Sequence, residues 1–198
     1  MDNSASLKRL SRKGRVLRAS EFQAAGIPRV QLSRWVREGK LQRLAPGLYA
    51  PPNYQPSEHG SLATVAHRAP RAVFCLLTAL RFHDLTTQAP FEIWIAIGNK
   101  DKPPRLKYPP LRVVRFSAAS LAEGIEVHTV EGVSLRVTSV ARTVVDCFKF
   151  RNKIGLDVAL EALREARRGK RASTDEMWRY AELCRVSNVM RPYLESVA

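Results

Sequence analysis

The stretch AAGIPRVQLSRWVREGKLQRLAPGLYA, residues 24–50, contains a helix end, a tight turn and a second helix in close succession. Ser20 is suited to cap the first, short helix, and Gly26 is suited to end it, because glycine adopts the left-handed conformation at little cost. Pro28 is suited to open the next helix, since its missing N–H has no partner there. The spacing therefore predicts a helix-turn-helix whose second helix covers residues 28–38.

The predicted helix over residues 28–38 has two different faces. Leu32, Trp35 and Val36 fall at helical spacing and form an apolar stripe. The remaining surface carries hydrogen-bond donors, namely Arg29, Gln31, Ser33, Arg34 and Arg37. One packed face and one face of donors is what a recognition helix needs to read base edges in a major groove of double-stranded DNA. A surface helix with solvated arginines is the alternative, but turn, stripe and charge coincide here, which favours DNA binding.

A β-hairpin is predicted directly after this helix. Alternating apolar residues flank the turn signal Pro46-Gly47 within residues 41–50. A hairpin in this position is a wing, and Lys40 and Arg43 are then placed to contact DNA phosphates, which position a protein without reading sequence. We expect the same of the basic residues before the core of this head, Arg12, Lys13 and Arg15. The proline-rich PPNYQP predicts an extended linker, so that a DNA-binding domain covers residues 1–56.

The distribution of charge also indicates a polyanionic partner. The chain has 198 residues with 33 Lys plus Arg against 18 Asp plus Glu, a net charge of +15. Residues 1–56 hold eleven basic and three acidic side chains, a balance of +8, whereas residues 57–198 carry +7 over more than twice the length. No apolar run approaches the ~20 residues of a membrane span, and the three cysteines stand singly. We therefore expect a reduced, cytoplasmic protein.

Residues 57–198 predict a larger α+β domain with a central sheet and C-terminal helices. The expected elements are helices over 62–67 and 73–83, strands over 91–97, 111–116, 125–130 and 133–137, and helices over 140–150, 156–167, 174–185 and 188–197. Glu131-Gly132 predicts a two-residue hairpin turn. The loop over residues 99–110 holds four prolines and four basic residues, Lys100, Lys102, Arg105 and Lys107. This composition is equally compatible with a loosely ordered, solvated loop and with a loop that binds a second stretch of DNA or an acidic partner.

The sequence contains no pattern that supports an enzyme, a metal or a cofactor. The four histidines show neither H-x-E nor H-E-x-x-H spacing, and no glycine-rich phosphate loop occurs. Arg142 and Asp146 lie four residues apart on one predicted helix, where they are expected to pair rather than to catalyse. The basic residues over 164–171 are expected to be a solvated helix end that complements the helix dipole. An alternative, a nucleic-acid-processing enzyme delivered by its winged helix, requires clustered carboxylates with a divalent metal.

The stretch over residues 24–50 resembles the DNA-binding head of the AbiEi family, whose members are antitoxins and transcriptional regulators of type IV toxin–antitoxin and abortive-infection systems. Downstream, LTALRFHDLT, FEIWIAI and VEGVSLRVTSVARTVVDCF are similar to the family's C-terminal domain in order and spacing. The most specific parts are Gly47-Leu48-Tyr49 at the wing end and the V-T-S-x-x-R-T-x-x-D segment over 137–146. Asp84 stands where the family commonly has glycine, so that turn is expected to differ.

The resemblance implies a repressor that binds double-stranded DNA, in repeats within the promoter of its own operon. It also implies an antitoxin-type C-terminal domain whose functional partner is a nucleotidyltransferase-like toxin, without requiring direct contact between the two proteins. A plain transcription factor with a sensing or oligomerising C-terminal domain is the remaining alternative, and a toxin gene next to this one is what would separate the two.

Overall fold

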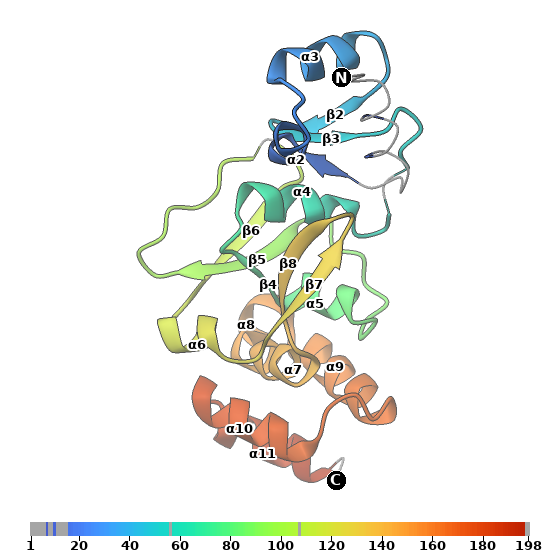
Figure 1. Cartoon of the computed structure of the whole chain (residues 1–198). Coiled ribbons are helices and arrows are strands. Elements are labelled where there is room, and N and C mark those ends of the chain that lie inside the picture. Colours follow the sequence, from blue (N-terminus) through green and yellow to red (C-terminus); the bar gives the residue numbers. More distant parts are fainter. Residues whose placement is uncertain (1–6, 8–9, 11–15, 56, 107, 197–198) are drawn as a thin grey trace. The chain divides into compact units, whose positions relative to one another are not determined.

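The structure, a computed structural model, describes residues 7, 10, 16–55, 57–106 and 108–196 and has the expected α+β composition (Figure 1). Its contacts divide the chain into two compact units. The first consists of Met1–Arg68 together with Thr129–Ser134, and the second of Ala69–His128 together with Leu135–Ala198. Within the described ranges no helix is long and apolar enough to cross a membrane.

The first unit contains the predicted helix-turn-helix and wing. Its elements are β1 (Leu17–Arg18), α2 (Ala19–Ala24), α3 (Arg29–Arg37), β2 (Gln42–Ala45), β3 (Leu48–Ala50) and α4 (Gly60–Arg68). The strands form an antiparallel sheet in the order β1–β3–β2, so β3 pairs both with its hairpin partner and with the short strand before α2. Gly47 in the β2–β3 turn has φ +81°, a conformation that favours glycine.

The two helices of the motif end as predicted but begin differently. α3 begins at Arg29, so Pro28 is its N-cap residue and not its first helical residue. Gly26 and Gly39 follow α2 and α3 with φ +79° and +68°. After α3 the N–H of Lys40 donates to the carbonyl of Trp35 at 2.9 Å, which satisfies a carbonyl that the helix end leaves free. At the start of α2, Ser20 is not the cap, because the helix begins at Ala19. The N-cap residue is Arg18, and its backbone N–H donates to the Glu21 carboxylate at 2.7 Å.

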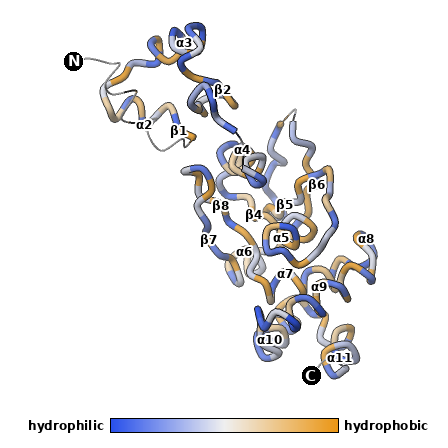
Figure 2. The backbone as a smooth tube through the Cα atoms, turned by 90° about the vertical axis from the view of Figure 1, so that its right-hand side faces the viewer, coloured by the Kyte–Doolittle hydropathy of each residue, from blue (hydrophilic) through white to orange (hydrophobic). Residues whose placement is uncertain are grey.

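The apolar core of the first unit centres on Phe22. The rings of Trp35 and Tyr49 meet the Phe22 ring edge-on, with centroids 6.5 and 6.0 Å away, a favoured aromatic geometry. Leu32 is fully buried in the same cluster. Val36, predicted in the apolar stripe, is only half-buried at its edge. Figure 2 shows the resulting alternation of hydrophilic and hydrophobic residues around the turns of α3.

The second unit is built on a five-stranded mixed sheet in the order β6–β5–β4–β8–β7. The strands are β4 (Val73–Phe74), β5 (Ile93–Gly98), β6 (Leu111–Phe116), β7 (Ile125–Val130) and β8 (Val133–Thr138). β5 is parallel to β6 and antiparallel to β4, and β4 is parallel to β8. Glu131 and Gly132 join β7 to β8 with φ +53° and +78°, the predicted two-residue turn.

Helices cover this sheet and extend the core away from it. They are α5 (Leu76–Phe82), α6 (Ala118–Ala122), α7 (Val140–Lys149), α8 (Arg151–Ile154), α9 (Leu156–Arg168), α10 (Thr174–Cys184) and α11 (Ser187–Ser196). α7 lies between the sheet and α10 and also contacts α9 (Figure 1). Every residue from Ala141 to Phe148 is buried, because α7 has neighbours on all sides. One hydrophobic cluster joins the sheet to α5, α7, α9, α10 and α11.

Several expectations for the second unit are corrected by the structure. The predicted helix from residue 73 begins only at Leu76, since Val73–Phe74 form the central strand β4, which is too short to show a period of two. The strand predicted over residues 91–97 covers Ile93–Gly98, and all residues from Ile93 to Ile97 are buried because both faces of β5 are covered. Phe91 lies outside that strand. The short helices α6 and α8 have no counterpart in the sequence-based prediction.

Candidate nucleic-acid interface

The predicted recognition helix presents one continuous exposed face. Val30, Ser33, Arg34 and Arg37 are all exposed and are spaced by three or four residues, so they share the side of α3 that points away from its buried seam. We call these four residues the α3 outer face. Arg29 is exposed beside it at the first turn, and Gln31 is half-buried at the flank.

Val30 is a member of this face that the sequence-based selection of donors missed. Its side chain is 79 % exposed. The i, i+3, i+4, i+7 spacing with Ser33, Arg34 and Arg37 is the signal by which it is recognisable in the sequence. Apolar side chains on such a face have a specific target in DNA, the C5-methyl group of thymine in the major groove.

Glu38 holds two of the predicted DNA contacts in place. Its carboxylate pairs with Arg34 Nε at 2.7 Å and with Lys40 Nζ at 2.9 Å. Hydrogen bonds from Lys40 and then Arg34 lower the pKa of Glu38, so the carboxylate stays ionised near neutral pH. The pair with Arg34 follows from i, i+4 spacing, but the pair with Lys40 depends on how the chain turns after α3. An acidic residue is thus neutralised within an otherwise basic surface.

The wing carries its predicted cation and is anchored at its tip. Arg43 is exposed on β2 opposite Tyr49, next to a bulge at Leu44 that sharpens the hairpin. At the tip, Nε2 of His67 from α4 lies 3.3 Å from the carbonyl of Pro46. Burial lowers the pKa of His67, so the ring is neutral near pH 7, and because a carbonyl only accepts, Nε2 carries the proton. The remaining predicted phosphate contacts, Arg12, Lys13 and Arg15, lie outside the described residues.

The predicted linker is tied to a distant turn. The backbone N–H and the hydroxyl of Ser57 both donate to Glu131 Oε1 at 2.8 Å, and the Tyr54 hydroxyl donates to the other carboxylate oxygen. Burial raises the pKa of Tyr54, and the hydrogen bond to Glu131 and then the Glu131 charge add to this shift. Glu131 belongs to the β7–β8 turn, which the contacts group with the first compact unit. The segment after Pro51 is therefore a docked strap over its described residues rather than a free spacer.

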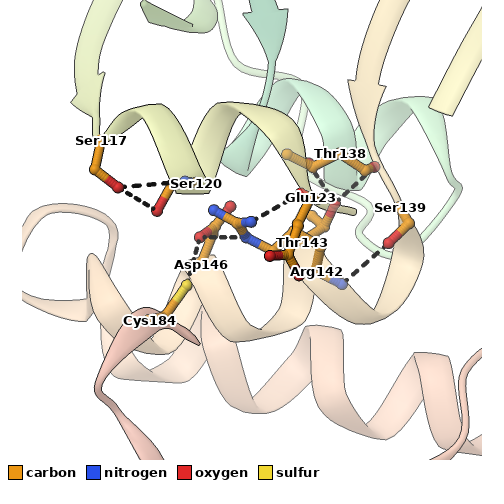
Figure 3. Close-up of polar contacts among 9 residues, drawn as sticks. All are labelled: Ser117, Ser120, Glu123, Thr138, Ser139, Arg142, Thr143, Asp146 and Cys184. Carbon is orange, nitrogen blue, oxygen red and sulfur yellow. Dashed lines mark hydrogen bonds and ion pairs between the residues drawn. The ribbon is translucent and has the colours of Figure 1, made fainter. Parts of the chain in front are cut away.

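Most of the motif over residues 137–146 is buried and has a structural role (Figure 3). Arg142 Nε pairs with Asp146 Oδ1 at 3.1 Å, as the i, i+4 spacing predicts, but both side chains are 0 % exposed. Arg142 Nη1 also donates to the carbonyl of Glu123 at 2.9 Å, and the Cys184 thiol lies 3.6 Å from Asp146 Oδ1. Burial raises the pKa of Asp146, and the charge of Arg142 opposes that shift. This ion pair joins α7 to α10 and to the turn after α6.

The other polar residues of the motif also bond inward. Ser139 caps α7 by accepting the N–H of Arg142 at 3.4 Å. The Thr143 hydroxyl donates to the carbonyl of Thr138 at 3.1 Å, and the same carbonyl lies 2.7 Å from Nε2 of the buried His83. In the part of the chain that the structure describes, no three His, Cys, Asp or Glu side chains are grouped in a way that holds a metal ion.

The basic loop over residues 99–110 is held at its beginning. Arg115 Nη1 donates to three carbonyls, those of Gly98, Asn99 and Asp101, at 2.7, 2.9 and 2.6 Å, so the expectation of loose order is wrong for these residues. Lys100, Lys102 and Arg105 are exposed, whereas Lys107 lies outside the described residues. At the end of α9, Arg168 pairs with Glu165 at 2.6 Å.

Residues 4–52 match the model of a protein family described as "Transcriptional regulator, AbiEi antitoxin". The matched range contains α2, α3 and the wing, and therefore the whole α3 outer face. The likeness predicted for the head is thus confirmed, while the likeness predicted for the downstream stretches stays a prediction. No curated protein matches the chain.

Proposed function

We propose that this chain, whose residues 4–52 match an AbiEi-type regulator, is a sequence-specific repressor that binds double-stranded DNA in the promoter of its own operon. The observation that carries the proposal is the α3 outer face, which presents arginines and a hydroxyl opposite the buried Leu32–Trp35 seam. A helix with this division fits a major groove, where arginine reads guanine through two parallel hydrogen bonds.

Each side chain of the head has a distinct role in this mechanism. Arg34 and Arg37 read base edges together with Ser33, Arg29 lies at the entry of the helix, and Gln31 contacts the flank. Val30 contacts thymine methyl groups. Binding of Arg34 to DNA exchanges its partner Glu38 for a base, while Lys40 keeps the carboxylate neutralised. Repression follows from steric exclusion of other proteins from the promoter.

The wing and the segment before the head supply sequence-independent affinity. Lys40 and Arg43 contact phosphates beside the groove, with Arg12, Lys13 and Arg15 on the neighbouring backbone. Because His67 holds the carbonyl at the wing tip, the wing is already shaped before DNA arrives, and less ordering entropy opposes binding.

The antitoxin part of the proposal assigns residues 57–198 to an antitoxin-type domain and residues 1–56 to DNA binding. Its support is the description of the matched family together with the order of the downstream stretches. The system is of type IV, and the functional partner is a nucleotidyltransferase-like toxin. Neutralisation of the toxin does not require that the two proteins touch.

The repressor proposal is tested by a gel shift of the full chain on the upstream region of its own operon and on a shuffled duplex of equal length. We expect a shift of the upstream region at concentrations at least 10³-fold below those that shift the shuffled duplex. Arg34→Ala combined with Arg37→Ala should remove the difference, whereas Arg164→Ala, an exposed arginine on α9, should keep it. Equal affinity of the unmodified chain for both duplexes refutes sequence-specific binding.

The antitoxin proposal is tested separately, by expressing the neighbouring gene alone and together with this chain. Growth arrest by the neighbour and rescue by the full chain support it. Rescue should persist with the Arg34→Ala, Arg37→Ala chain when both genes are driven from an unrelated promoter, because neutralisation is assigned to residues 57–198. A neighbour that is harmless when expressed alone contradicts the toxin–antitoxin assignment and leaves the repressor proposal standing.

A further inference from the structure

Two large aromatic side chains of the second unit are left in water. Phe91 is 82 % exposed and Tyr108 is 76 % exposed. Burial of an aromatic side chain is favourable, so two exposed rings are more informative than a single exposed apolar residue.

The sheet brings these two residues to the same end of one strand pair. β5 and β6 lie side by side and run parallel, with Ile93 opposite Leu111 (Figure 1). The N–H of Ile93 donates to the carbonyl of Pro110 at 2.9 Å, so the pairing extends to the first residues of both strands. Phe91 precedes β5 by two residues and Tyr108 precedes β6 by three. Both therefore stand at the N-terminal end of this strand pair, although 17 positions separate them in the sequence.

The chain around the two rings is basic, since residues 91–112 hold five Lys or Arg against two Asp or Glu. Arg112, the second residue of β6, lies with its guanidinium 5.6 Å from the centre of the Trp94 ring and remains 58 % exposed. Its Nε pairs with Glu92 at 3.1 Å, so the acidic residue next to Phe91 is already neutralised. Arg105, three positions before Tyr108, is exposed as well. We call Phe91, Tyr108, Arg105 and Arg112 the aromatic platform.

We propose that the aromatic platform binds single-stranded nucleic acid, with bases stacked on Phe91 and Tyr108 and phosphates in contact with Arg105 and Arg112. Aromatic rings accept every base because each base has a flat face, and neighbouring cations follow the backbone. A duplex does not fit this chemistry, since its bases are already stacked and paired. The charge of the surroundings argues against an ordinary protein partner, which would have to be acidic. This site is independent of the α3 outer face.

The test measures fluorescence anisotropy of labelled 12-nucleotide single strands of mixed sequence, as DNA and as RNA, with the full chain. Phe91→Ala combined with Tyr108→Ala should weaken binding by tenfold or more, because stacking contributes substantially for each base. Tyr108→Phe should retain binding, since it keeps the ring. Val127→Ala is the matched control: Val127 is 68 % exposed on β7, the other edge strand of the same sheet. Comparison of the DNA strand with the RNA strand shows which nucleic acid the chain prefers.

A crossed design separates this site from the head. Arg34→Ala with Arg37→Ala should abolish specific duplex binding and leave single-strand affinity unchanged, whereas the double platform variant should show the reverse. A strand carrying 5-iodouracil should cross-link under ultraviolet light to Phe91 or Tyr108. The proposal is overturned if the platform variant binds single strands as tightly as the unmodified chain does, or if the head variant no longer binds single strands. It is also overturned if the unmodified chain binds no single strand, which is the result expected when a protein covers the rings. Unchanged thermal unfolding of each variant shows that the fold is intact.

Discussion

At the scale of single residues, Arg34 and Arg43 illustrate two kinds of exposed cation in the head. Arg34 stands in the middle of the α3 outer face, and Arg43 stands on the wing. We expect Arg34→Ala to cost ~1–3 kcal/mol of specific binding and to blur preference at particular bases. Arg43→Ala should weaken all duplexes about equally and make the salt dependence shallower by about one unit. Selection of bound sequences from a random pool, with titrations at several salt concentrations, measures both; identical behaviour of the two variants contradicts the groove assignment.

Val30 permits a test of direct base reading by one side chain. Replacing a contacted thymine with uracil removes only the C5-methyl group, and a buried methyl is worth about 0.8 kcal/mol, or roughly fourfold in affinity. We expect this loss with the unmodified chain at one or two thymines in the selected site. Val30→Ala should lose the same amount on thymine DNA and nothing further on uracil DNA. Additive losses in this double-mutant cycle would show that Val30 contacts no methyl group.

His83 makes the second unit sensitive to acid. Burial lowers the pKa of His83, while its hydrogen bond to the Thr138 carbonyl opposes this shift less strongly. The unfolded chain therefore takes up a proton near pH 6.5 before the folded one does, and stability falls as the pH drops below that value toward the folded pKa. Urea unfolding at pH 7.5 and 5.5 should show this loss, and His83→Gln, which keeps a donor but does not titrate there, should reduce it. The pKa of His67 is also lowered, so His67→Gln is the corresponding variant for the first unit.

At the scale of elements, the buried ion pair decides how α7 is fixed. The spacing of Arg142 and Asp146 predicts their pairing, which is worth ~0.3–0.5 kcal/mol where such a pair is exposed. Because both side chains are buried, Arg142→Met leaves a carboxylate without its cation, and we expect a loss of about 3–5 kcal/mol in the free energy of unfolding. Adding Asp146→Leu should recover most of that loss, since no charge is then left behind. Chemical denaturation measures the free energy of unfolding of both variants and of the unmodified chain. Arg164→Met, on the exposed side of α9, is the control, and its free energy of unfolding should stay within about 0.5 kcal/mol of that of the unmodified chain.

The helix ends show how far local chemistry reaches. Both glycine stops of the helix-turn-helix agree with their sequence signals. At the start of α10, the S-x-x-E spacing of Ser173 and Glu176 is the sequence signal of a capping box, and each side chain bonds the other residue's backbone N–H at about 3 Å. The start of α2 does not agree with its sequence signal, because its N-cap residue, Arg18, lies in β1, which pairs with β3. A competing strand thus shifts a boundary that capping preferences alone place elsewhere.

At the scale of the whole molecule, the chain has two compact units with separate apolar clusters, one around Phe22 and one around α7. We expect two transitions in differential scanning calorimetry, because each cluster supports a cooperative unit. Arg142→Met should lower the melting temperature of the second unit's transition and leave that of the first unit unchanged. Operator binding at 25 °C should then also be unchanged. A single transition that shifts as a whole contradicts independent unfolding of the units.

The sequence by itself determined the features that depend on neighbours along the chain. Gly26, Gly39 and the Pro46-Gly47 turn mark where helices and strands stop, and helical spacing separates Leu32 and Trp35 from the arginines, so the head and most of its candidate contacts follow from local rules. Only the tertiary structure decided what depends on distant partners. It buried Arg142 and Asp146, made Val73–Phe74 a central strand, tied Ser57 to Glu131 and left Phe91 in water. The physical reason is that burial and strand pairing are set by groups far apart in sequence, and no local period records which of them will meet.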